Sequence, residues 1–223
     1  IRIPSSLCGI VGLKPTFGRV SRHGVYPLAW TLDTVGPMTR TVRDAALVLN
    51  AIAGHDPRDP SSSPNPTEDY TSGLDRGVDG LRVGVPREFF YDVIDPEVEE
   101  AVSRSARVLE GLGASVEETS IPVLDHSLAI SGTILLAEAA EVHIDNLRNR
   151  ADEIGADVRA RLEQGALTTA PDYIKAQRAR RVFNEGIASA MTRYDVLLAP
   201  TEPIGASRIS ETTVQVGGKD QVA

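Results

Sequence analysis

The sequence predicts an α/β fold, and three patterns along the chain carry this prediction. Residues 81 to 85 alternate as a strand, Asp95-Pro96 supplies an N-cap and a first-turn proline for a helix, and residues 115 to 117 can return as a second strand. Strand, helix and strand in this order form a βαβ unit. The short apolar run from 195 to 200 is typical of a strand buried on both faces.

Composition limits the classes of partner. The 223 residues are enough to bury a substantial core, and the formal net charge of -8 includes no dense basic block. This pattern argues against a nucleic-acid surface and favours a neutral or cationic partner. The sequence has no run of 18 apolar residues and no signal peptide, so we expect no membrane association. The single Cys8 can form no internal disulfide, which favours a reducing cytoplasm.

The first half of the chain alternates loops with one helix. Residues 1 to 40 are rich in glycine and proline and should form short strands and tight loops. Residues 42 to 53 keep helical spacing after the capping residue Thr41, and Gly54 should stop the helix. The prolines and serines that follow predict an exposed, weakly held loop over residues 55 to 72.

The second half is predicted to be mainly helical. Helices are expected at residues 125 to 150 and 171 to 193, with a short one at 157 to 164 between them. In the last long helix we expect four side chains to point inward, namely Ile174, Phe183, Ile187 and Met191. The polar stretch from 201 to 223 shows no closing element.

A search for catalytic motifs gives a negative result. The sequence has no G-x-S-x-G elbow, no H-E-x-x-H, no phosphate-binding loop and no G-x-G-x-x-G. Its four histidines lack the spacing of metal ligands, so we predict no metal site. The basic residues Lys175, Arg178, Arg180 and Arg181 are most simply the solvated face of a helix.

Three blocks resemble one enzyme family. Residues 1 to 21, which include Gly9-Ile10-Val11-Gly12-Leu13-Lys14-Pro15-Thr16, are similar to the second half of the amidase signature, whose first half ends in Gly-Gly-Ser. Residues 32 to 46 resemble the next block of the family and residues 195 to 201 a late one. The likeness spans residues 1 to 205.

This resemblance implies the α/β amidase-signature fold, a mixed twisted β-sheet covered by helices, of which the chain holds the C-terminal portion only. Residues 1–223 are then the later part of a single domain, without its upstream catalytic portion and extreme C-terminus. The family cleaves amides with a Ser, cis-Ser, Lys triad, and all three residues would precede Ile1. The chain would therefore hold no catalytic residue, be inactive alone and need the missing upstream half.

The resemblance also leaves alternatives open. The intact protein would be a cytoplasmic amidase without cofactor that acts on a small-molecule amide. The segment from Tyr26 to Thr34 favours this over the A subunit of a glutamyl-tRNA amidotransferase. A non-catalytic domain and a homodimer are further options.

Two residues are candidates for substrate binding. Arg2 would stand two positions after the nucleophile, where it could orient the turn or meet a substrate carboxylate. The alternative for Arg2 is an ion pair with the missing half. Asp33 lies in a loop expected to reach the active-site side, and its alternative is a carboxylate that ties down its own turn.

Overall fold

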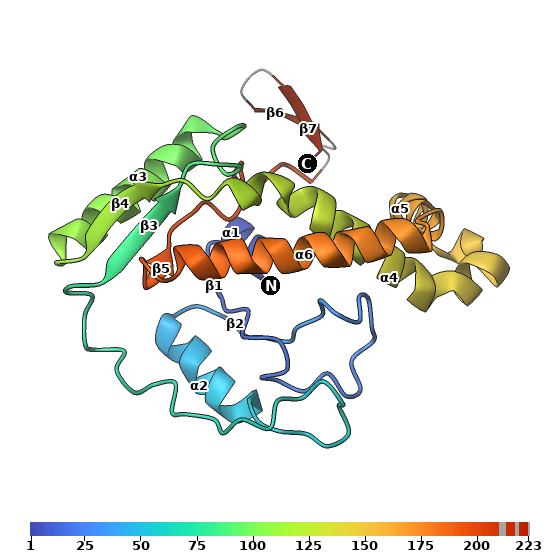
Figure 1. Ribbon diagram of the computed structural model, residues 1–223, viewed down its shortest axis with the longest axis horizontal. Coiled ribbons are helices and arrows are strands. Elements are labelled where there is room, and N and C mark those ends of the chain that lie inside the picture. Colours follow the sequence, from blue (N-terminus) through green and yellow to red (C-terminus); the bar gives the residue numbers. More distant parts are fainter. Residues whose placement is uncertain (210–212, 217–218, 223) are drawn as a thin grey trace.

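The computed structural model describes residues 1–209, 213–216 and 219–222, and it has a small parallel sheet, a group of long helices and a loop-rich part (Figure 1). In chain order the elements are α1 (Arg2–Leu7), β1 (Val11–Gly12), β2 (Met38–Thr39), α2 (Val42–Ile52), β3 (Arg82–Pro86), α3 (Pro96–Gly111), β4 (Ser115–Thr119), the 3₁₀ turn η1 (Pro122–His126), α4 (Ser127–Asn149), η2 (Ala151–Glu153), α5 (Ala156–Ala166), α6 (Ala170–Ala190), β5 (Val196–Leu197), β6 (Thr213–Val216) and β7 (Lys219–Val222).

The predicted βαβ unit is confirmed. The sheet has the order β4-β3-β5 with all strands parallel, and Val83 pairs with both Val116 and Val196. The α3 helix begins as predicted, because the Asp95 side chain accepts a hydrogen bond of 2.8 Å from the backbone N–H of Glu97. The helix lies against β4 (Figure 1).

The prediction of a strand buried on both faces at residues 195 to 200 was wrong. The β5 strand contains only Val196 and Leu197, and it pairs with β3 alone. Val196 is 40% exposed, so the face of the strand on which it lies is not fully covered. An apolar run shows that burial is favoured, but it does not show what lies on each side.

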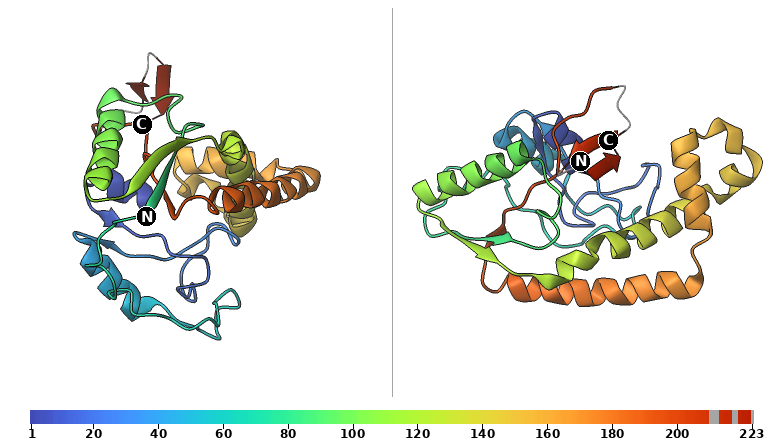
Figure 2. Two further views of the ribbon diagram at one scale, coloured as in Figure 1. Left: turned by 60° about the vertical axis from the view of Figure 1, so that its left-hand side comes forward. Right: turned by 90° about the horizontal axis from the view of Figure 1, so that it is seen from above.

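The three predicted helices of the second half are present as α4, α5 and α6. The α4 and α6 helices run side by side, and α5 lies at their far end (Figure 2). The inward-facing set of α6 was predicted only in part, because Ile174 is 57% and Met191 39% exposed while Phe183 and Ile187 are half-buried. Among the helices and strands, α6 packs mainly against α4 and η1.

The η1 turn and α4 together form a stretch, Pro122–Asn149, that is long and apolar enough to cross a membrane by length and composition. The α4 helix packs against α5 and α6, and it carries a buried charge at Glu138. Length and composition alone therefore do not establish a membrane span for this helix.

The loop-rich part surrounds α2. This helix is capped as predicted by Thr41, whose hydroxyl oxygen accepts from the N–H of Asp44 at 3.1 Å. It ends where Ala53 turns to an extended conformation and forms a β-bridge with Val20. The following loop is irregular and mostly exposed, yet Asp59 and Ser62 are buried within it. Its first part is consequently held more firmly than the prolines and serines predict.

The expectation of no closing element after residue 201 was also wrong. The β6 and β7 strands form an antiparallel pair, with Val214 opposite Gln221. Residues 210–212, 217–218 and 223 of that stretch lie outside the described residues. Only the first strand carried a signal in the sequence, since Thr213-Val214-Gln215-Val216 alternates polar and apolar residues whereas Lys219-Asp220-Gln221-Val222 does not.

Candidate functional site

The start of α1 is packed tightly against the β1–β2 pair. A Cβ atom on Gly12 would lie 2.2 Å from Ser5 Oγ and 2.9 Å from the carbonyl oxygen of Ile1, and one on Gly36 would lie 3.1 Å from Ile1 Cδ1. Both positions therefore need glycine for this close approach. Ser5 is 2% exposed, and its Oγ has no hydrogen-bond partner among the described residues. The packing fixes Ile1 and leaves a buried hydroxyl beside it.

Three cationic side chains from distant segments gather near this point. Partial burial, followed by the positive charges of Arg2 and Arg180, lowers the pKa of Lys14 from its ordinary value. Arg2 comes from α1, Lys14 follows β1, and Arg180 comes from α6. The three positive charges repel one another, and a negatively charged or strongly polar group placed between them would reduce this repulsion.

A hydrogen-bond network ties the loop after Ala29 to the long helices. The carboxylate of Glu138 accepts from the Thr31 backbone N–H and from the Thr31 hydroxyl, each at 2.8 Å, and from the Tyr173 hydroxyl at 2.7 Å. Arg180 Nη1 donates to Thr31 Oγ1 at 3.0 Å, and its Nη2 donates to the Thr31 carbonyl at 3.2 Å. Burial, followed by the hydrogen bond to Glu138, raises the pKa of Tyr173.

An apolar pocket of about 180 Å³ lies between the same loop and the helices α4 and α6. Its walls are mainly apolar, formed by Leu32, Ile130, Ile134 and Phe183, and its polar lining residues are Ser127, Ser131, Arg180 and Asn184. The Oγ of Ser127 is buried and has no hydrogen-bond partner among the described residues. The pocket therefore combines apolar walls with an unused hydroxyl and a guanidinium.

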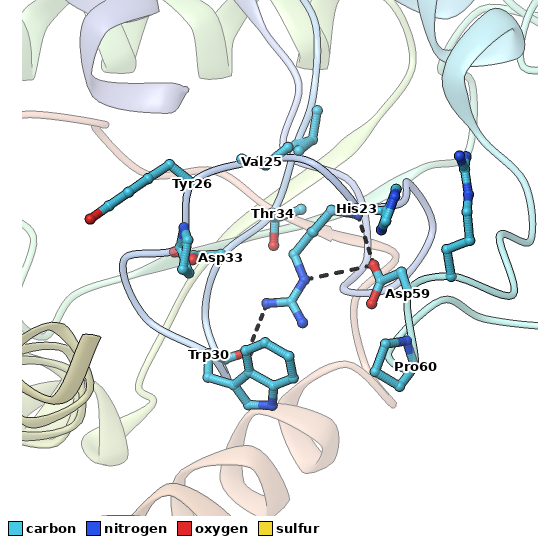
Figure 3. A pocket seen from close by; sticks show the side chains of 12 residues that line it. His23, Val25, Tyr26, Trp30, Asp33, Thr34, Asp59 and Pro60 are labelled. Carbon is cyan, nitrogen blue, oxygen red and sulfur yellow. Dashed lines mark hydrogen bonds and ion pairs between the residues drawn. The ribbon is translucent and has the colours of Figure 1, made fainter. Parts of the chain in front are cut away.

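A larger pocket of about 340 Å³ lies on another side of this loop (Figure 3). Arg22 is one of its lining residues; its guanidinium donates to the Trp30 carbonyl at 2.7 Å and pairs with Asp59 at 3.9 Å. The guanidinium carbon also lies 4.7 Å from the ring centroid of Phe17 and 5.2 Å from that of Trp30. These contacts make Arg22 a link between two loops.

The two predicted substrate-binding residues lie in different places. Asp33 lines the larger pocket, but its carboxylate accepts from the N–H groups of Leu28 and Ala29 within its own loop. Arg2 lies in the cationic cluster and lines neither pocket. Arg2 and Asp33 therefore share neither of these pockets, and their role in binding stays a prediction.

Sequence reasoning missed Glu138, Thr31 and Arg180. Arg180 was expected on a solvated face, whereas it is half-buried and bound to Thr31. A readable signal was the acidic residue within Leu135-Leu136-Ala137-Glu138-Ala139-Ala140, because a charge in an apolar stretch needs a specific partner. Over the described part of the chain, no group of three or more His, Cys, Asp or Glu residues is placed to hold a metal ion.

Known proteins share extensive sequence similarity with this chain. The model of a family described as Amidase matches residues 1–222. The chain is 48% identical over 212 residues to an amidase of Pseudomonas putida, covering 95% of this chain and 46% of the relative. It is 40% identical over 237 residues to the A subunit of the glutamyl-tRNA(Gln) amidotransferase of Carboxydothermus hydrogenoformans, covering 96% and 49%.

A solved structure resembles the whole chain. It comes from a study of a vestigial protein complex and the evolutionary origins of an s-triazine catabolic enzyme, and it matches with a TM-score of 0.94 and 36% identity. The match covers 100% of this chain and 48% of that one. The chain thus spans about half the length of the relatives it matches.

Proposed function

Because this chain belongs to the amidase-signature family, we propose that the intact protein hydrolyses a small-molecule amide to a carboxylate and ammonia or an amine. By intact protein we mean these residues together with the part that the matched relatives have in addition. The observation that supports the proposal best is the 48% identity to an amidase over 95% of this chain.

The catalytic triad is proposed to lie upstream of Ile1. In this mechanism a lysine, acting through a bridging cis-serine, removes the proton of a serine hydroxyl, and the serine oxygen attacks the amide carbonyl carbon. Backbone N–H groups stabilise the resulting oxyanion, the amine leaves with a proton, and water then releases the carboxylate. The tight packing around Ile1 supports this assignment, because it would hold a preceding residue in a defined place.

The residues of this chain are proposed to form the substrate side of the site. A pocket of about 180 Å³ is close in size to the cavity of about 150 Å³ that takes up benzene in an engineered protein. We propose a substrate with a compact apolar group for this pocket and a carboxylate or other acceptor for Arg2 and its neighbouring cations. Asp33 is the second proposed contact, since a carboxylate has further acceptor positions beyond its bonds to Leu28 and Ala29.

A second candidate function is supported by the amidotransferase relatives. Identity to the A subunit from Carboxydothermus hydrogenoformans is 40% over nearly the whole chain. This second role predicts release of ammonia from glutamine and dependence on partner proteins. Hydrolysis of simple amides without any partner favours the first function instead.

The deciding experiment measures ammonia release by the intact protein from a panel of neutral and carboxylate-bearing primary amides and from glutamine. We expect turnover by the intact protein, none by residues 1–223 alone, and recovery when the two halves are combined. Activity of the purified chain by itself would refute the upstream triad. Activity restricted to glutamine and a partner complex would favour the amidotransferase function.

A further inference from the structure

Glu138 is a buried carboxylate whose hydrogen bonds go to the loop and to the neighbouring helix. The residue is 8% exposed, and two of its three donors belong to Thr31, which lies 107 residues earlier in the sequence. The third donor is the Tyr173 hydroxyl. A buried charge is costly unless its oxygens are fully hydrogen-bonded, so this arrangement depends on Thr31 staying in place.

Thr31 lies at the point where the loop separates the two pockets. The residue before it, Trp30, lines the larger pocket, and the residue after it, Leu32, lines the apolar one. Arg180 donates to both the hydroxyl and the carbonyl of Thr31, and it also lines the apolar pocket. A guanidinium has five N–H donors, so these two bonds orient it and leave others for a ligand.

We propose that Glu138 is a positioning residue for the substrate side of the site, which holds Thr31 and, through Thr31, fixes Arg180 and the wall formed by Leu32. The proposal rests on the proposed amide hydrolase function. We assign Glu138 no part in bond cleavage, because its side chain is buried and lines neither of the two pockets. Without the hydrogen bonds from Thr31 to Glu138 the loop can move, and Arg180 and Leu32 would then no longer be placed correctly for contact with substrate.

The first test separates binding from chemistry with near-isosteric variants of the intact protein. In Glu138→Gln an NH₂ group replaces one carboxylate oxygen, so that a donor faces the Thr31 or Tyr173 groups that donate to Glu138. In Thr31→Val the hydroxyl is lost. We expect each variant to raise KM about tenfold with kcat within about twofold, since a positioned binding wall is affected and the nucleophile is not. Thr31→Ser keeps the hydroxyl and should retain the wild-type KM.

A double-mutant cycle shows whether the two residues act as one unit. Glu138→Gln combined with Thr31→Val should raise KM little more than either change alone, because both break the same contact. Tyr173→Phe is the matched control, since it removes a donor to Glu138 without touching Thr31, and KM should change less than threefold. If KM in the double variant rises by the product of the two single increases, the residues act independently, which would contradict the proposal.

The second test does not depend on activity. Trp30 is the only tryptophan in the 223 residues, and it lies next to Thr31. A released loop should raise the quenching of its fluorescence by acrylamide about twofold in Glu138→Gln, with an unchanged far-ultraviolet circular dichroism spectrum. Any tryptophan in the upstream half is replaced by phenylalanine for this measurement.

The two tests distinguish the possible failures. Unchanged quenching overturns the role of Glu138 in holding the loop. Increased quenching with unchanged KM overturns its role for substrate, and lower thermal stability with unchanged KM and quenching identifies a merely structural residue. A wild-type protein without amidase activity refutes the proposed function and with it the substrate role, while quenching still decides whether Glu138 holds the loop.

Discussion

Polar side chains hold an irregular backbone in the loop region, which we define as residues 17–35 and 54–63. Backbone hydrogen bonds hold regular strands in the sheet region, which comprises residues 82–86, 115–119 and 194–198. Asp59 illustrates the first kind: it is 5% exposed, and its carboxylate accepts from the backbone N–H of Arg22 at 2.7 Å and from the Ser61 hydroxyl at 2.6 Å. Val83 illustrates the second, since it is fully buried in the central strand β3.

The two regions should differ in how strongly their stability depends on single side chains. An irregular loop has no repeating ladder, so each buried backbone group needs its own partner. In the sheet region the backbone supplies most partners itself, and α3 contributes no buried residue. Single side chains should therefore matter more in the loop region, and three measurements examine this.

The largest effect is expected for Asp59→Ala. This change leaves the Arg22 guanidinium, whose side chain is 10% exposed, without an anionic partner and removes the acceptor for the Ser61 hydroxyl. Breaking a buried pair in this way costs about 3–5 kcal/mol of unfolding free energy, measured by urea denaturation of the intact protein. The matched control is Asp75→Ala, which breaks an exposed pair with Arg43 and should have little effect. Equal losses of unfolding free energy in the two variants would show that the loop region does not depend on the buried Asp59.

A second measurement concerns the rate of proteolysis at two arginines of the irregular chain that follows α2. Arg58 and Arg76 both stand in irregular chain, but Arg58 adjoins the buried Asp59 whereas residues 72–77 are exposed. Trypsin should cut after Arg76 about tenfold faster than after Arg58, because cleavage requires local opening. Digestion in denaturant provides the control for sequence preference. Faster cutting after Arg58 would show that the contacts of Asp59 do not hold the loop.

The same contrast explains which features could be predicted from the sequence. The caps of α2 and α3 were predicted correctly because Thr41 and Asp95 act on N–H groups two or three residues away. The contact between Glu138 and Thr31 joins residues 107 positions apart, and no local pattern reports it. Only the apolar surroundings of Glu138 indicated that it would need a partner.

Burial was predicted less well than secondary structure. Periodicity shows which side chains of α6 share a face, but the face that is covered depends on α4 and η1. Ile174 was consequently expected inside and is 57% exposed. The family resemblance was the most informative feature of the sequence, because the blocks at 1–21 and 32–46 indicated a fold that the composition alone did not.

The smallest effect is expected in the sheet region, at the ion pair between Arg82 and Asp195. Arg82 donates to the carboxylate from Nη2 at 2.8 Å, from Nε at 3.1 Å and from its backbone N–H at 2.9 Å. These hydrogen bonds, the side-chain ones first, lower the pKa of Asp195 to about 2. An aspartate in the unfolded chain has a pKa of about 3.9.

The sign of the pH dependence follows from these two pKa values. Because the folded pKa is lower, the unfolded state binds more protons between about pH 4 and pH 2, so the contribution is complete above about pH 4 and is lost as the pH falls through about 2. In Asp195→Asn we expect a small loss of stability at pH 7, since both groups are largely exposed and the bonds from Asp195 N–H to the Arg82 carbonyl and from Leu198 N–H to the Gly84 carbonyl persist at 2.9 Å. The difference in urea midpoint between wild type and variant should shrink toward zero near pH 2 at constant ionic strength. A constant difference would exclude the lowered pKa, and a loss at pH 7 as large as that of Asp59→Ala would show that the sheet region depends on single side chains as the loop region does.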